Sequence, residues 1–179
     1  MRKVLFILGQ LTDSDADWLS DNGERIRVAK GTTLIKHGAR ISTVYIILEG
    51  SMAVVTVRGL KLAEVASGDI LGEMSLVDSG LTAASVTTLQ DSLVLAVSKQ
   101  QLVDKLKQDI GFASRFYRAL ALFLADRMRS TISRMGYESG NSADDDAAQS
   151  DGDELDEDVL DNVHLAGARF ERMLKKMAG

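Results

Sequence analysis

The stretch from Arg25 to Val97 is the feature that most limits how this chain can fold. It consists of short β-branched and aliphatic segments, which are RIRVA, TTLIK, TVYIILEG, SMAVVTV, KLAEVA and DSLVLAVS. Glycine interrupts the stretch at positions 31, 38, 50, 59, 68, 72 and 80. Short strands separated by turn residues at intervals of ~8 to 12 are typical of an all-β sandwich or barrel. The sequence therefore predicts a mainly β fold here.

Helical patterns flank this β-rich stretch. Residues 12–22 (TDSDADWLSDN) predict a short helix that begins after Thr12 as N-cap and ends at Gly23. Val4 to Leu8 is an apolar run too short for a signal-peptide core of ~7 to 15 residues, so we expect an arm or first helix that packs on the core. Beyond Ser98, apolar residues recur at helical spacing and predict one long amphipathic helix, closed by Gly136 and Gly140. These apolar residues are Phe112, Phe116, Leu120, Phe123, Leu124, Met128, Ile132 and Met135.

The last forty residues differ in charge from the rest. Residues 144–161 contain ten of the 26 acidic residues and no basic one, which leaves 16 acidic and 21 basic residues elsewhere. A polar and acidic segment such as 139–153 predicts a solvated linker, and its charge disfavours binding to nucleic acid. A stripe of apolar residues then predicts a terminal amphipathic helix, which could fold back on its own domain, pair across a dimer or dock on another protein. The stripe is Val159, Val163, Ala166, Phe170, Met173 and Met177.

Composition excludes several kinds of site. The chain has no cysteine, which excludes disulfides and thiolate sites and fits a reducing cytoplasm. His37 and His164 are far apart in sequence, so we expect no metal centre and no metal-dependent chemistry of the kind that other double-stranded β folds perform. No apolar run approaches the ~18 residues that would span a bilayer.

Residues 68–88 (GDILGEMSLVDSGLTAASVTT), which we call the cassette, have the chemistry to hold a phosphorylated sugar. Gly72 allows a turn, and the Glu73 carboxylate can accept a hydrogen bond from a ribose hydroxyl. Ala83 and Ala84 are small enough to expose backbone amides to an anion.

The cassette, together with AKGTTLIKHGA and VYIILEGSMAV in that order, resembles the cyclic nucleotide-binding domain family, the ligand-binding module of catabolite activator-type regulators and kinase regulatory subunits. The resemblance implies a double-stranded β-helix, also called a β-roll or jelly roll, with flanking helices and a long C-terminal helix. We expect this domain at residues 1–135, an acidic linker at 136–154 and the amphipathic helix at 155–179.

The resemblance also implies binding residues. Gly72, Glu73 and Met74 match the ribose-binding side of the family motif, and Ala83 and Ala84 match the small residues whose amides reach the cyclic phosphate. On the long helix, two polar residues fall near the position where relatives contact the purine; these are Ser130 and Thr131.

Thr82 is a departure, because cyclic AMP- and cyclic GMP-binding members usually carry an arginine at that position. The absence of this arginine should weaken binding of a cyclic nucleotide by about ten- to a hundred-fold, unless another cation replaces it. Five basic residues lie near predicted turns, and the sequence alone does not say whether any faces the pocket: Lys30, Lys36, Arg40, Arg58 and Lys61. Asp78 would add repulsion if it faced the phosphate.

We therefore expect a cytoplasmic, non-enzymatic regulatory protein that binds cyclic AMP or cyclic GMP. It would meet a protein partner or a second copy through the long and terminal helices. The alternative is a ligand-free protein-interaction scaffold with the same fold. A transcription factor is disfavoured, because the glycine-rich and acidic residues 136–161 followed by one helix leave too little chain for a helix-turn-helix.

Overall fold

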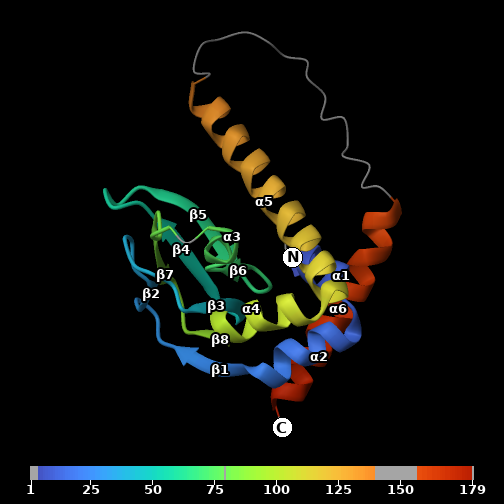
Figure 1. The fold of residues 1–179 in the computed structure, drawn as a ribbon. Helices are drawn as coiled ribbons and strands as arrows, with labels where there is room; N and C mark the ends of the chain where they lie inside the picture. The colour runs from blue at the N-terminus through green and yellow to red at the C-terminus, as the bar shows by residue number, and fades with distance from the viewer. Residues whose placement is uncertain (1–3, 79, 140–156, 179) are drawn as a thin grey trace.

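The computed structural model describes residues 4–78, 80–139 and 157–178, and their arrangement confirms the predicted β-roll with flanking helices (Figure 1). Eight strands form two antiparallel four-stranded sheets, in the orders β1-β8-β3-β6 and β2-β7-β4-β5. The strands are β1 (Gly23–Val28), β2 (Thr33–Ile35), β3 (Thr43–Glu49), β4 (Ser51–Val55), β5 (Lys61–Ala66), β6 (Ile70–Leu71), β7 (Ser85–Thr88) and β8 (Ser92–Ser98). The helices are α1 (Val4–Gln10), α2 (Asp13–Asn22), α3 (Met74–Val77), α4 (Lys99–Gln108), α5 (Ile110–Ser139) and α6 (Glu157–Ala178).

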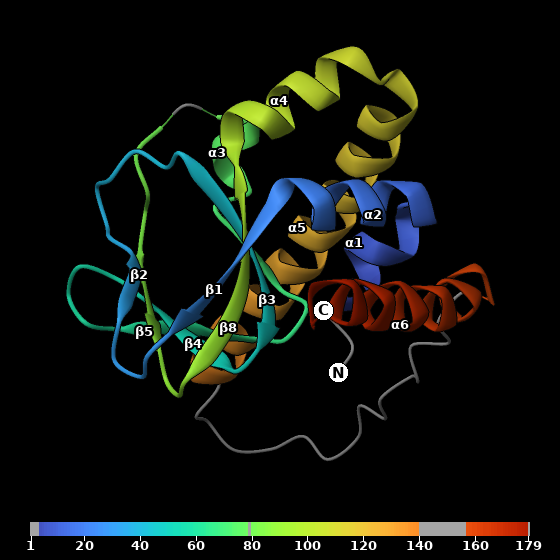
Figure 2. The ribbon, with the colours of Figure 1, turned by 90° about the horizontal axis from the view of Figure 1, so that it is seen from below.

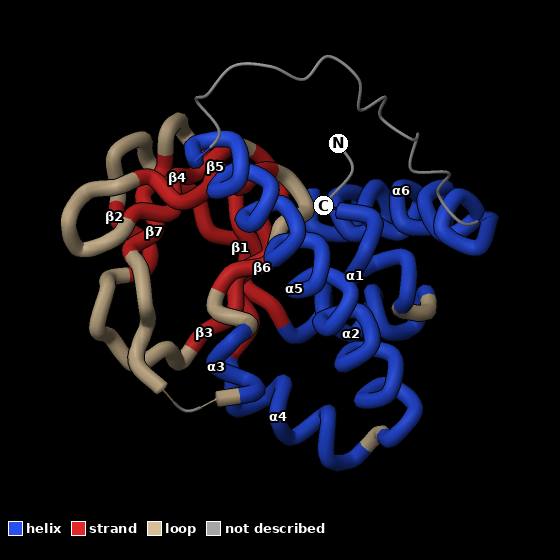
Figure 3. Tube along the Cα trace, turned by 90° about the horizontal axis from the view of Figure 1, so that it is seen from above, coloured by secondary structure: helices blue, strands red, loops and turns tan. Residues whose placement is uncertain are grey.

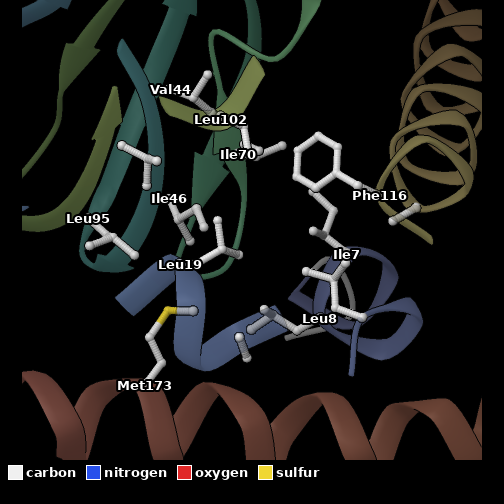
Figure 4. Packing of buried hydrophobic residues seen from close by; sticks show 14 of the residues in the cluster. Ile7, Leu8, Leu19, Val44, Ile46, Ile70, Leu95, Leu102, Phe116 and Met173 are labelled. Atoms are coloured by element: carbon white, nitrogen blue, oxygen red, sulfur yellow. The ribbon is translucent and has the colours of Figure 1, made fainter. Parts of the chain in front are cut away.

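The strands gather on one side of the molecule and most helices on the other, as Figure 3 shows. A first apolar cluster includes residues of both sheets, such as Ile47 and Val94 from one and Met52 and Val86 from the other. A second cluster joins the opposite face of the β1-β8-β3-β6 sheet to the helices. In Figure 4, Phe116 of α5 points toward the sheet, and Met173 points from α6 toward the N-terminal helices. The β-roll therefore has a core of its own and a second core that it shares with the helices.

Two helical boundaries follow from capping. Thr12 caps α2 as predicted, since its hydroxyl accepts from the amide of Asp15 while the Asp15 carboxylate accepts from the amide of Thr12. Asp109 separates α4 from α5, because its carboxylate accepts from the Phe112 amide at 2.8 Å in the manner of an N-cap. We did not predict α4 as a separate helix.

The long helix was expected to close at Gly136 and Gly140, but α5 passes through Gly136 and continues to Ser139. One glycine inside a helix costs only about 1 kcal/mol, which a long helix tolerates. Most of the predicted acidic linker, namely residues 140–154, lies outside the described residues.

The terminal helix α6 folds back on its own chain and lies along α1 and α2, as Figure 2 shows. Its residues Ala166 and Met173 are buried in the apolar cluster that includes residues of α1 and α2. Arg169 pairs with Asp13 at 2.7 Å and donates to the last carbonyls of α1, and Arg172 pairs with Asp17. The side chains of Val159 and Val163 lie outside the described part of the chain.

Candidate functional site

Local packing requires one glycine of the cassette, Gly72. Gly72 has φ of 82°, a conformation that side chains with a Cβ rarely adopt. A Cβ added there would also lie 3.0 Å from the carbonyl oxygen of Thr43. The turn sets Glu73 at the start of α3, with only 3% of its surface exposed.

Arg127 of α5 reaches this buried carboxylate. Its Nη1 donates to Glu73 Oε1 at 2.9 Å, although the two residues are 54 positions apart in sequence. The guanidinium also lies over the ring of Phe123, with its Cζ 5.3 Å from the ring centroid. The cassette and the long helix are thus joined by a charged contact.

The environment of Glu73 shifts the pKa of its carboxyl. Burial raises the pKa of the Glu73 carboxyl, and the nearby charge of Asp69 raises it further. The charge and hydrogen bond of Arg127 act in the opposite direction, but burial outweighs them. A carboxyl whose pKa is raised inside a folded domain is a common mark of a functional site.

The outer surface of the cassette is apolar. Met74 is 61% exposed, and Val77 and Leu81 are exposed to a similar extent. Met74, which the sequence placed with Gly72 and Glu73, therefore points away from the core rather than into it.

Thr82 follows Glu73 by nine residues in the cassette and contacts the turn after β2. Its hydroxyl donates to the carbonyl of Lys36 and accepts from the amide of Ala39 at 3.0 Å. Its backbone amide donates to the carbonyl of Ala39, and its carbonyl accepts from the amide of Gly38. Ser85 adds a contact, because its hydroxyl accepts from the amide of His37 at 2.9 Å. Thr82 and Ser85 therefore hold this part of the cassette against the turn after β2.

The small residues beside Thr82 keep their backbone accessible. Ala83 is exposed and Ala84 is half-buried. Neither amide donates to an acceptor among the residues that the structure describes. Asp78 is exposed, and its Oδ1 accepts from the amide of Gly80 at 3.0 Å. The role of Ala83 and Ala84 in binding a phosphate stays a prediction.

Ser130 and Thr131 belong to α5, but their side chains lie outside the described residues. Arg127, which precedes Ser130 by less than one helical turn, contacts the cassette. The purine-binding role of Ser130 and Thr131 stays a prediction.

Sequence reasoning missed both connections of the cassette. Arg127 was one of several arginines between apolar residues of the long helix, and nothing local distinguishes it from Arg115 or Arg129. The pairing of Thr82 with residues 36–39 depends on how β2 and β7 align, which a sequence does not specify.

Two surface hollows lie away from the cassette. One, of ≈ 690 Å³, is lined by α2 and α6 residues such as Asp17 and Arg172. The other, of ≈ 450 Å³, is lined by residues such as Glu24, Tyr45 and Gln101. Neither hollow is lined by a cassette residue.

Two kinds of site find no support in the described part of the chain. No group of three metal-ligating side chains occurs there. None of the helices described is long and apolar enough to cross a membrane.

Comparison with known proteins matches residues 25–109 to the model of the cyclic nucleotide-binding domain. An uncharacterized NTE family protein of Mycobacterium bovis is 28% identical over 118 residues, which are 66% of this chain and 20% of that protein. The Pycsar effector protein XpPycTIR of Xanthomonas perforans is 33% identical over 106 residues, or 59% of this chain and 35% of that one. The chain therefore spans about a fifth and about a third of these relatives.

A solved structure has the same fold. The crystal structure of a cyclic nucleotide-binding domain from Methylobacillus flagellatus KT superimposes with a TM-score of 0.68 at 19% identity. The match covers 80% of this chain and 84% of that one. The comparisons and the described residues indicate no DNA-binding domain.

Proposed function

Residues 25–109 of this chain form a member of the cyclic nucleotide-binding domain family, and from this we propose that the chain is a cytoplasmic, non-enzymatic regulator whose cassette binds cyclic AMP or cyclic GMP. The observation that carries the proposal is the buried carboxyl of Glu73. It lies in the cassette, where the family resemblance implies a contact with ribose, and it is held by an arginine of the long helix.

The contact between Glu73 and Arg127 suggests how binding would be transmitted. A ribose hydroxyl that donates to Glu73 competes with Arg127 for the same carboxylate. Ligand would therefore change the energy of one arrangement of α5 relative to another, which is what a ligand must do to shift a conformational equilibrium. The helix that carries Arg127 is then the element that responds.

The outer face of α5 is where the response would be sensed. Met128 is 66% exposed and Ile132 is 57% exposed, whereas the earlier apolar residues Phe112, Phe116 and Phe123 are buried. We propose that a protein partner or a second copy of the chain meets this face. The apolar side of α6 already packs on α1 and α2, so α6 is the weaker candidate.

A ligand-free scaffold is the alternative, and the bonding of Thr82 favours it. Threonine at the position of the family arginine is uncharged, so it offers no cation to a phosphate. Its hydroxyl already makes two internal hydrogen bonds. In that case the cassette would serve only to connect the β-roll to α5.

Calorimetric titration distinguishes the two functions. The protein would be titrated with cyclic AMP and cyclic GMP, and the same titrations would be made with Glu73→Ala. The matched control is Glu64→Ala, which removes an exposed glutamate paired with Lys61 on β5. Saturable binding that Glu73→Ala weakens and Glu64→Ala leaves unchanged supports the sensor. No heat from either nucleotide with the folded wild-type protein would support the scaffold.

A further inference from the structure

The turn at residues 36–40 (KHGAR) is unusually basic. It contains Lys36, His37 and Arg40, and all three are exposed. The chain from Arg25 to Leu48 contains no acidic residue, so no carboxylate of this segment neutralises the turn. Neither Lys36 nor Arg40 forms an ion pair within the described residues.

Five hydrogen bonds hold this turn against Thr82 and Ser85, which flank the small residues expected to reach the phosphate. We call residues 82–85 the phosphate end of the cassette. Four involve Thr82, which bonds to Lys36, Gly38 and Ala39 through its hydroxyl and backbone. The fifth joins the amide of His37 to the hydroxyl of Ser85. Arg40 follows Ala39 directly, so its Cα is about 3.8 Å from that of a residue bonded to Thr82.

Two of the other basic residues near turns, Lys30 and Lys61, are placed less favourably. Lys30 lies at the far end of β7, where Gly31 bonds to Thr88, about 10 Å along the strand from Ser85. Lys61 is already paired with Glu64 at 2.7 Å. The acidic residue nearest in sequence to the phosphate end, Asp78, accepts from the amide of Gly80.

From this arrangement we propose that the basic turn, through Lys36 and Arg40, neutralises the phosphate of the ligand in place of a side chain at position 82. The inference rests on the proposed function, because it assigns the phosphate contacts of that same site. The anion lies between these cations and the amides of Ala83 and Ala84. Thr82 has the role of holding the turn in place, so the positive charge has moved from the cassette to the loop beside it.

The test compares Lys36→Gln and Arg40→Gln with the control Lys30→Gln. The control removes an exposed charge that precedes β2, whereas Lys36 and Arg40 follow β2. Each variant would be titrated with cyclic AMP and with adenosine, which lacks the phosphate. We expect each of the first two changes to weaken cyclic AMP binding about tenfold, with little effect on adenosine and none from Lys30→Gln. Adding Thr82→Arg to the double variant should restore part of the affinity, because it returns a cation to the cassette.

The outcomes separate the two proposals. The double variant carries both Lys36→Gln and Arg40→Gln. If it is folded and binds cyclic AMP as tightly as the wild type does, the role of the basic turn is overturned and the proposed function stays intact. Wild-type protein that binds no cyclic nucleotide would overturn both. Thermal melting of every variant checks that the exposed substitutions leave the fold unchanged.

Discussion

Two buried carboxylates of this protein are each paired with an arginine of α5, yet their environments shift their pKa values in opposite directions. Asp15 lies on α2 and binds Arg115 through both oxygens, at 2.7 and 3.0 Å. Glu73 lies in the cassette and binds Arg127, twelve residues further along the same helix. Both carboxylates are almost inaccessible to solvent.

The difference lies in the balance between burial, which acts more strongly at Glu73, and the groups that oppose it. Burial acts to raise the pKa of Asp15, but hydrogen bonds from Arg115 and from the amide and hydroxyl of Thr12 outweigh it and hold the pKa below its usual value. At Glu73 burial prevails, and the pKa is raised despite Arg127. The pair at Asp15 therefore anchors α2 to α5, whereas at Glu73 the arginine does not offset the effect of burial on the pKa. That contrast is what we expect between a structural contact and a ligand-responsive one.

Removing Arg127 should have the largest effect on stability. Arg127→Met keeps the length of the side chain but leaves a buried carboxylate without its cation, and it also loses the contact with Phe123. We expect a loss of about 3 kcal/mol in the free energy of unfolding at neutral pH, near the lower end for breaking a buried pair because Arg127 is partly exposed. Urea denaturation measures this, and a loss below that of Arg115→Met would reverse the comparison.

Arg115→Met should have the next largest effect. Its side chain is 36% exposed, and Asp15 keeps the hydrogen bonds from Thr12, so we expect a loss of about 2 kcal/mol after allowing for solvent screening. The control is Arg172→Ala, which breaks a more exposed pair with Asp17 and should leave the denaturation midpoint unchanged. A large effect of the control would mean that burial does not govern these pairs.

The pH dependence of stability should also distinguish Asp15 from Glu73, with a smaller effect than the arginine substitutions. The lowered pKa of Asp15 means that its contribution is present above about pH 3.8 and is lost as pH falls through the folded pKa. The raised pKa of Glu73 means that stability declines as pH rises from about 4.5 through its folded pKa. Relative to the wild type, Asp15→Asn should therefore lose stability and Glu73→Gln should gain it as pH rises. Equal slopes from denaturation at several pH values would contradict the opposite pKa shifts.

Much of this fold was predictable because its signals are local. Thr12 and the acids after it specify the start of α2, and the glycine-punctuated segments specify most of the strands. Other elements gave too little signal: β6 has two residues, and β7 (SVTT) was not distinguished from the end of the cassette. The boundary at Asp109 had a capping residue that we did not use.

The site was predictable only in part. Gly72, Glu73 and the small residues follow a sequence pattern, whereas the partners of Glu73 and Thr82 come from residues 54 and 46 positions away. Such contacts depend on how α5 crosses the β-roll and on how β2 pairs with β7, so no periodicity reveals them.

The most direct test of the link between cassette and helix is hydrogen exchange of the α5 amides from Leu120 to Arg129, with and without saturating cyclic AMP. The measurement would be made on the wild type and on Arg127→Met. We predict that ligand changes the exchange of these amides in the wild type and has little effect on them in the variant. Identical exchange with and without bound ligand in the wild type would contradict the coupling of Glu73 to α5.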